Sequence, residues 1–232
     1  MSGERVAVVT GAAGGMGGAI AQQLRDVGMR VVGLDRKIAE GCDLSFQVDV
    51  AVASELREAV AAAEADLGEV EAFVSAAGHY ESISFTEITD AEAQRMLRVH
   101  LGGFFAGAQA VLPGMIARGH GSIVSISSEL AIGGGDRDTH YAAAKGALLG
   151  AVKSLAAEVA GFGVRVNAVA PGPTNTPMLS PDSPWREPAY LATLPTRSLA
   201  EPQDVARCVE FLVCADTFMV GEVLHPNSGA VI

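Results

Sequence analysis

Three side chains, Ser128, Tyr141 and Lys145, have the types and spacing of a proton-transfer site. Tyr141 and Lys145 are four residues apart in an alanine- and leucine-rich run that predicts a helix, so both lie on one face of one turn. A neighbouring ammonium stabilises a phenolate and would lower the tyrosine pKa from its ordinary value of about 10. Ser128 ends the strand-like run GSIVSISS upstream. A tyrosine–lysine pair alone also occurs on solvated helix faces, so its meaning depends on the rest of the chain.

A glycine-rich turn near the N-terminus supplies a second functional pattern. Residues 10–17, TGAAGGMG, follow the apolar run RVAVV and precede GAIAQQLRDVG, which has helical periodicity. Such a turn lets a phosphate approach the backbone, where the helix N-terminus offers free N–H groups and the positive end of its dipole. Asp35 ends the next apolar run, where a carboxylate can grip the hydroxyls of a ribose. Together these features predict a dinucleotide site.

With both patterns in place, the chain resembles the short-chain dehydrogenase/reductase family over nearly its whole length. The family's Ser, Tyr and Lys match Ser128, Tyr141 and Lys145. Its remaining motifs match Thr10, Gly11, Gly15 and Gly17 in the glycine turn, Asp49-Val50 beside the adenine, Ser75-Ala76-Ala77-Gly78, and Arg165-Val166-Asn167 with Pro171-Gly172 and Thr176.

The resemblance implies a role for each matching residue. Tyr141 would be the general acid in carbonyl reduction and the base in alcohol oxidation. Lys145 would lower its pKa and hold the nicotinamide ribose, and Ser128 would bind the substrate oxygen. Ser127 should point to the opposite face of the strand. The expected cofactor-binding residues are Gly11, Gly15, Met16, Gly17, Asp35, Arg36, Asp49, Val50, Ala76, Ala77, Gly78, Tyr141, Lys145, Pro171, Gly172, Thr174 and Thr176.

The choice of cofactor depends on two neighbouring residues. The Asp35 carboxylate would accept hydrogen bonds from the ribose diol of NAD and repel the 2′-phosphate of NADP. The guanidinium of Arg36 is a group that could bind such a phosphate. The variable positions of the glycine turn, Ala12, Ala13 and Gly14, add no second basic group. The sequence therefore favours NAD, with NADP as the alternative.

Strand-like and helix-like runs alternate along the chain, which predicts a doubly wound, Rossmann-like parallel α/β sheet. The expected strands lie near 5–9, 30–35, 45–48, 71–75, 121–126, 164–169 and 221–225, and the helices near 16–27, 52–66, 91–118, 140–161 and 202–214. Residues 1–232 are expected to form a single dinucleotide-binding and catalytic domain. The stretch between Asp35 and Asp49 is too short for a full crossover helix. Residues 171–201 are rich in proline and predict a loop that covers the substrate.

Composition limits the possible partners and location. The net charge of −11 gives no reason to expect nucleic acid or an anionic membrane as a partner. The N-terminus does not read as a signal peptide, and no apolar run is expected to reach membrane-spanning length. The three cysteines lack metal-ligand spacing, so we expect reduced thiols, a cytoplasmic location and no metal. Apolar residues around much of helices 91–118 and 140–161 predict a homo-oligomer, a tetramer or a dimer.

Three positions depart from the family pattern. His100 stands where the family usually has an asparagine that helps to hold a proton-relay water. A histidine can donate and accept, so it could take over that role, or it could simply pack within its helix. Ser75-Ala76 replaces a pair of asparagines, and Asn227-Ser228-Gly229 replaces an Asp-Gly-Gly turn with little expected consequence.

The substrate is the least constrained prediction. The expected pocket residues are mostly apolar or aromatic: His79, Tyr80, Leu130, Ile132, His140, Met178, Leu179, Trp185, Tyr190 and Leu191. Such walls suit a small cyclic, aromatic or otherwise apolar secondary alcohol or ketone. Arg186 and Arg197 are expected to be solvated. The leading hypothesis is an NAD-dependent oxidoreductase; the alternatives are an NADP-dependent carbonyl reductase, an epimerase that uses bound nicotinamide, and a dinucleotide-sensing protein without turnover.

Overall fold

Seven parallel strands form one sheet in the order β3-β2-β1-β4-β5-β6-β7, which confirms the predicted doubly wound, Rossmann-like fold. The computed structural model describes residues 5–215 and 218–231. The strands are β1 (Val6–Thr10), β2 (Arg30–Asp35), β3 (Leu44–Gln47), β4 (Val70–Ser75), β5 (Gly121–Ile126), β6 (Val164–Val169) and β7 (Val223–Leu224). The chain moves outward from β1 to β3 and then returns to β4 on the other side of β1. The carboxyl ends of β1 and β4 therefore flank a topological switch point, where ligands of such sheets bind.

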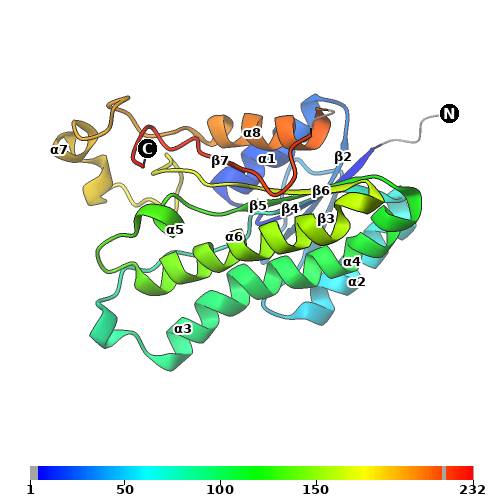
Figure 1. Ribbon diagram of the computed structural model, residues 1–232, viewed down its shortest axis with the longest axis horizontal. Coiled ribbons are helices and arrows are strands. Elements are labelled where there is room, and N and C mark those ends of the chain that lie inside the picture. The colour runs from blue at the N-terminus through cyan, green and yellow to red at the C-terminus, as the bar shows by residue number, and fades with distance from the viewer. Residues whose placement is uncertain (1–4, 216–217, 232) are drawn as a thin grey trace.

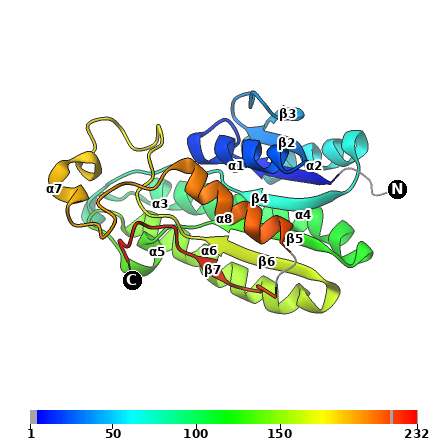
Figure 2. The same ribbon diagram turned by 90° about the horizontal axis from the view of Figure 1, so that it is seen from above.

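Helices cover both faces of the sheet (Figures 1 and 2). Helices α1 (Gly15–Asp26) and α8 (Pro202–Cys214) lie on one face, and α2 (Ala53–Leu67), α4 (Gly103–Arg118) and α6 (Thr139–Val159) on the other. Alternate side chains of β1 enter the two cores: Val6 and Val8 pack with α2, α4 and α6, whereas Ala7 and Val9 pack with α1 and α8. This two-sided burial explains why the strands read as continuous apolar runs.

The predicted helix 91–118 is interrupted by a π-helical turn. Helix α3 (Asp90–Leu97) leads into this turn at Arg98–Gly102 and continues as α4. By length and composition alone, the run from Asp90 to Arg118 is apolar enough to cross a membrane, with a mean hydropathy of 1.3, contrary to the expectation that no run reaches that length. In the structure α4 packs on α2, β4 and β5, and 44% of the most apolar stretch is buried.

Two segments were predicted to break the regular alternation of strands and helices, and both do so. No helix forms among residues 36–43, so β2 is followed directly by β3. Residues 171–201 extend past the carboxyl ends of the strands, at the left of Figure 1, and we call this segment the lid. Several short elements were not predicted: α5 (Leu130–Gly133), α7 (Pro188–Leu191), and 3-10 turns at Phe85–Glu87, Ala160–Phe162 and Pro184–Arg186.

Candidate active site

Ser128 lies directly beyond the carboxyl end of β5 and is 6% exposed. Its Oγ accepts a hydrogen bond from the Leu130 N–H at 3.2 Å and donates to Glu129 Oε2 at 3.1 Å. Ser127 points away from the pocket, as predicted, and its Oγ donates to the Lys145 carbonyl oxygen at 2.9 Å. The two serines therefore have different tasks: one faces the site and the other fixes helix α6 to the sheet.

Tyr141 and Lys145 occupy the first two turns of α6, on the face toward β5. Lys145 is 5% exposed, and its Nζ donates to the Ile126 carbonyl oxygen at 2.8 Å. The same Nζ lies 5.6 Å from the centroid of the Tyr141 ring. Ser128 and Tyr141 also line a common pocket, so the structure brings the three predicted residues together.

Burial controls the protonation of this group. It lowers the pKa of Lys145 to about 7 and raises the pKa of Tyr141 above its ordinary value. The nearby Glu129 carboxylate raises the Tyr141 pKa further, and hydrogen bonding to Ser128 counteracts this only in part. The pKa of Tyr141 is therefore raised, contrary to the expectation that Lys145 lowers it. Desolvation of the phenolate outweighs a cation that is itself desolvated.

The glycine turn after β1 has the close contacts that a phosphate-binding turn requires. Gly11 has a φ of +72°, and a Cβ there would lie 2.8 Å from Ala77 Cα. A Cβ on Gly17 would collide with the Gly11 carbonyl oxygen. Thr10 Oγ1 accepts hydrogen bonds from the N–H groups of Ala76 and Ala77, both at 3.1 Å, and so joins the ends of β1 and β4. No side chain caps the N-terminus of α1, so its N–H groups are left for a ligand anion.

The predicted adenosine side of the cleft follows β2 and β3. Asp35 Oδ2 accepts a hydrogen bond from the Ala13 N–H at 3.2 Å, which holds the carboxylate beside the glycine turn. Arg36 is exposed, and its guanidinium forms no hydrogen bond or ion pair with a described residue. Asp49 Oδ1 accepts from the Ala51 N–H at 2.9 Å. The Val50 side chain is buried against α4 at Gly103, so only its backbone can face a ligand.

The start of the lid completes the cleft. A Cβ on Gly15 would lie 2.9 Å from Thr176 Cβ, which places the lid against the first turn of α1. Thr174 Oγ1 donates to the Gly172 carbonyl oxygen at 2.8 Å. A Cβ on Gly172 would lie 2.7 Å from the Asn227 carbonyl oxygen, so glycine is needed there. One pocket is lined by Gly172, Thr174 and Thr176 of the lid together with Met16 of α1.

This arrangement agrees with three comparisons with known proteins. The family profile described as enoyl-(acyl carrier protein) reductase matches residues 11–230. The chain belongs to the short-chain dehydrogenase/reductase family. It is 34% identical to the short-chain reductase protein NovJ of Streptomyces niveus, over 99% of this chain and 95% of that protein. It is equally identical, at 34%, to 3-oxoacyl-(acyl-carrier-protein) reductase FabG of Escherichia coli, over 97% and 96%.

This short-chain dehydrogenase/reductase is also similar to a second dehydrogenase in sequence and to a third in structure. The 4-formylbenzenesulfonate dehydrogenase TsaC1/TsaC2 of Comamonas testosteroni is 34% identical, over 97% of both chains. The ligand-free structure of Thermoplasma acidophilum aldohexose dehydrogenase (AldT) superposes with a TM-score of 0.91 at 27% identity, covering 98% of this chain and 94% of that one. The family is one of oxidoreductases that bind a nicotinamide dinucleotide.

His100 sits in the π-helical turn, where the short-chain dehydrogenase/reductase family usually has asparagine. Its ring is 2% exposed and stacks on His79 with 5.5 Å between centroids. Its Nε2 lies 2.9 Å from the His79 carbonyl oxygen and 3.4 Å from the His79 backbone nitrogen. The carbonyl oxygen can only accept, so we assign the proton to Nε2 on the shorter of the two contacts. Burial, and then the proximity of Lys145, holds the pKa of His100 well below its usual range. His100 is therefore neutral, and its Nδ1 has no partner among the described residues.

The substrate pocket beside Tyr141 has aromatic walls. Tyr80 stands edge-on to Tyr141 with 5.2 Å between ring centroids and packs on Trp185 of the lid at 5.4 Å. The Tyr80 hydroxyl donates to Asp138 Oδ1 at 2.7 Å, which fixes the ring. The pocket is lined by Met16, Tyr80, Ser128, Glu129, Leu130, Tyr141, Gly172, Pro173, Thr174, Thr176, Met178, Leu179 and Trp185. The predicted residues His79, Ile132, His140, Tyr190 and Leu191 are not among these.

Two residues have roles that sequence reasoning missed. Glu129 lines the pocket and is 7% exposed, and burial raises its pKa to about 7. An acidic residue directly after Ser128 was the available signal. Arg186 was expected to be solvated, which is wrong: it donates to Asn175 Oδ1 at 2.8 Å and to the carbonyl oxygens of Leu179 and Ser180 at 3.0 and 3.1 Å. Arg186 therefore holds two parts of the lid together. Arg197 is exposed, as expected.

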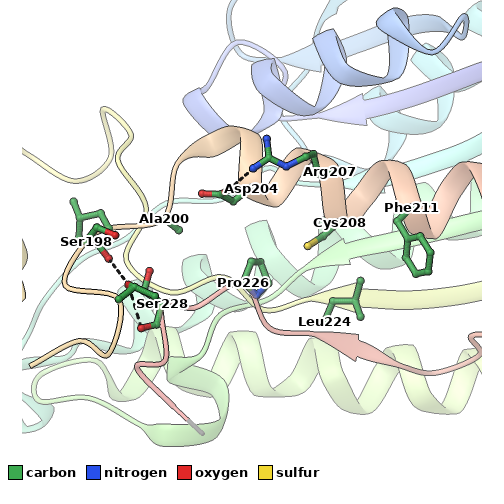
Figure 3. Close-up of a pocket in the computed structure, with 11 residues that line it drawn as sticks. Ser198, Ala200, Asp204, Arg207, Cys208, Phe211, Leu224, Pro226 and Ser228 are labelled. Atoms are coloured by element: carbon green, nitrogen blue, oxygen red, sulfur yellow. Dashed lines mark hydrogen bonds and ion pairs between the residues drawn. The ribbon is translucent and has the colours of Figure 1, made fainter.

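A second hollow lies outside this site. Figure 3 shows it as an open groove between α8 and the C-terminal segment, lined by Cys208, Phe211, Leu224 and Pro226 among others. An ion pair between Asp204 and Arg207 borders it. None of the predicted site residues lies there. Among residues 5–215 and 218–231, no group of three His, Cys, Asp or Glu side chains could hold a metal ion.

Proposed function

We propose that this chain is an NAD-dependent oxidoreductase that interconverts a secondary alcohol and a ketone. The observation that carries the proposal is that Ser128 and Tyr141 line one pocket, with Lys145 Nζ 5.6 Å from the centroid of the Tyr141 ring. A dinucleotide-sensing protein without turnover would have no need of this proton-transfer group.

Each residue has a distinct task in that reaction. The nicotinamide, when bound, supplies or accepts the hydride. Ser128 donates a hydrogen bond to the substrate oxygen, where negative charge develops during reduction. Tyr141 gives a proton to that oxygen in reduction and takes it in oxidation. The ammonium of Lys145 is held near the phenol by the Ile126 carbonyl oxygen. After Tyr141 has given up its proton, Lys145 supplies a new one, by way of solvent. His100 offers an unpartnered Nδ1 lone pair to a water on that path.

The preference for NAD rests on the placement of Asp35. Its carboxylate is fixed against the glycine turn by the Ala13 N–H, where the adenosine ribose would lie. A 2′-phosphate there would meet like charge. The exposed guanidinium of Arg36 favours the alternative, an NADP-dependent carbonyl reductase, because it has no competing partner among the described residues.

The pocket walls favour a small cyclic, aromatic or otherwise apolar substrate. Tyr80, Trp185, Leu130 and Leu179 provide flat and aliphatic surface. One relative's name, 4-formylbenzenesulfonate dehydrogenase, describes an aromatic carbonyl compound, which supports an aromatic substrate here. We also propose that residues 1–232 act as one catalytic unit in the cytoplasm and assemble as a homotetramer or dimer.

A screen of secondary alcohols and ketones with NAD and NADP tests the proposal, read at the absorbance of the reduced nicotinamide. Turnover of a cyclic or aromatic alcohol–ketone pair with NAD is the expected result. Cofactor binding without turnover of any member of the panel would favour the sensing protein. Turnover only with NADP would favour the carbonyl reductase.

A further inference from the structure

One carboxylate faces an otherwise apolar pocket. We propose that Glu129 accepts a hydrogen bond from a hydroxyl on the carbon next to the reacting carbon, so that the preferred substrates are vicinal diols and α-hydroxy ketones. This inference rests on the proposed function and narrows its substrate class.

The backbone of Glu129 is held firmly at the carboxyl edge of the sheet. Its N–H donates to the Pro171 carbonyl oxygen at 3.0 Å, which joins the ends of β5 and β6. Its carbonyl oxygen accepts from the N–H groups of Ile132 and Gly133, both at 2.9 Å. Glu129 is the N-cap residue of α5, but its side chain makes no capping hydrogen bond. The backbone N–H groups of Glu129 and Leu130 act on the carboxylate and lower its pKa, but less strongly than burial raises it.

The distance between Glu129 and Ser128 suits a substrate with oxygens on two neighbouring carbons. Glu129 Oε2 lies 3.1 Å from Ser128 Oγ, the group that binds the reacting oxygen. In a vicinal diol the second oxygen lies about one hydrogen-bond length, ~2.8 Å, from the first. A substrate oxygen bound by Ser128 would therefore carry a neighbouring hydroxyl into the reach of the carboxylate. A hydroxyl farther along the substrate would meet Leu130, Leu179 or Trp185 instead.

The surroundings of Glu129 call for a donor from the ligand. The side chain is 7% exposed, and no described Lys, Arg or His forms an ion pair with it. Asp138 is the charged side chain that acts on it, and it repels. The side-chain donor to this carboxylate is the Ser128 hydroxyl, at 3.1 Å. When that single proton turns to the substrate oxygen, the buried carboxylate loses this donor, which is costly unless the ligand supplies another. Because burial raises its pKa to about 7, this group can accept from a hydroxyl when ionised or donate to a ketone oxygen when protonated. Glu129 can therefore bind both the diol and the hydroxy ketone. A substrate ammonium, in contrast, would require Glu129 to be fully ionised.

The decisive measurement is the ratio of kcat/KM for cis-1,2-cyclohexanediol to that for cyclohexanol. Wild type should prefer the diol at least tenfold. Glu129→Leu, which removes the acceptor, should bring the ratio close to one. Glu129→Gln, which keeps a carbonyl acceptor, should give an intermediate ratio. Glu58→Gln, an exposed carboxylate on α2, is the control and should leave the ratio unchanged.

Three results would overturn the proposal. The first is a wild-type ratio near one. The second is a Glu129→Leu enzyme that loses both activities equally, since Glu129 would then only orient Ser128. The third is a preference for 2-aminocyclohexanol over the diol, which would assign the site to an ammonium.

A binding readout separates this inference from the proposed reaction. Trp185 is the only tryptophan of the chain and lines the pocket, so its fluorescence reports ligand binding without turnover. If no panel member is oxidised, yet the diol binds at least tenfold more tightly than cyclohexanol and Glu129→Leu removes the difference, the reaction is wrong and the recognition stands. Equal binding of the two ligands would overturn the recognition by Glu129.

Discussion

The imidazole of His100 stands edge-on to the phenol ring of Tyr141, with 5.6 Å between the ring centroids. The ring is neutral, donates from Nε2 to His79, and presents an unpartnered Nδ1 acceptor inside the site. An asparagine side chain offers an acceptor of the same kind. His100 therefore has the chemistry to hold a water on the path between Lys145 and Tyr141.

His100→Asn should retain most of the wild-type kcat. The pH profile near neutrality should not change, because the pKa of His100 is already well below its usual range. His100→Leu, which removes the acceptor, should lower kcat by about tenfold or more. The pH dependence of kcat for both variants checks this. A large loss in His100→Asn would show that the imidazole has a role of its own.

Tyr141→Phe removes the phenol that we assign to proton transfer and keeps the ring. Turnover should fall by at least the ~10²-fold typical of a lost acid–base group, while cofactor binding survives. Lys145→Ala should impair both turnover and cofactor binding. Steady-state kinetics and a cofactor titration separate the two effects. Tyr190→Phe is the matched control, because Tyr190 does not line the pocket. Normal turnover in Tyr141→Phe would refute the mechanism.

Stability should pass through a minimum near neutral pH because of two buried groups. The pKa of Glu129 is raised from 4.5 to about 7, so its stabilising contribution is full below pH 4.5 and is lost as pH rises to 7. The pKa of Lys145 is lowered from 10.5 to about 7, so stability increases as pH rises from 7 toward 10.5. Melting temperatures across this range test both slopes. Glu129→Gln should flatten the acid limb alone, and Lys145→Met the alkaline limb alone.

Cofactor preference should follow Asp35. We expect NAD to exceed NADP in kcat/KM by at least tenfold, about 1.4 kcal/mol. Asp35→Ala should lower the ratio of kcat/KM with NAD to kcat/KM with NADP. The substitution removes hydrogen bonds to the ribose of NAD and relieves the repulsion of the 2′-phosphate of NADP. Arg36→Ala should leave the NAD reaction largely intact and lower any residual use of NADP. Equal efficiency with the two cofactors in wild type would show that Arg36 controls this end of the cleft.

Assembly should depend on the outer face of α4. Phe105 is 49% exposed there and Leu97 at the end of α3 is 42% exposed, a large apolar surface for a helix that already covers the sheet. We expect a tetramer or dimer by light scattering at micromolar concentration. Phe105→Glu should lower the mass of the assembly measured by light scattering. Ile38→Glu, at an exposed apolar residue after β2, should leave that mass unchanged. A monomeric wild type would contradict the prediction.

The strands and the proton-transfer residues could be predicted because their signals are local. Two-sided burial makes each central strand a continuous apolar run, and Tyr141 and Lys145 share a helix face by spacing alone. The position of Glu129 after Ser128 is visible in the sequence, but its burial is not. The role of Arg186 could not be predicted, because its contacts with other lid residues form only when the lid folds. The raised pKa of Tyr141 was missed for a related reason: the sequence shows the neighbouring lysine but not the depth of burial. Short elements such as α5 and α7 likewise have too few residues for a periodic pattern.

The sheet ends in short strands on both sides. One rim is formed by β3, a strand of four residues, and the opposite rim by β7, a strand of two. An open rim exposes unpaired backbone groups that can recruit strands from other chains, and short rim strands limit this hazard. Neither rim offers enough hydrogen bonds to extend the sheet into a neighbouring copy. Growth by edge-to-edge aggregation is therefore disfavoured, which leaves the helical faces for regular association.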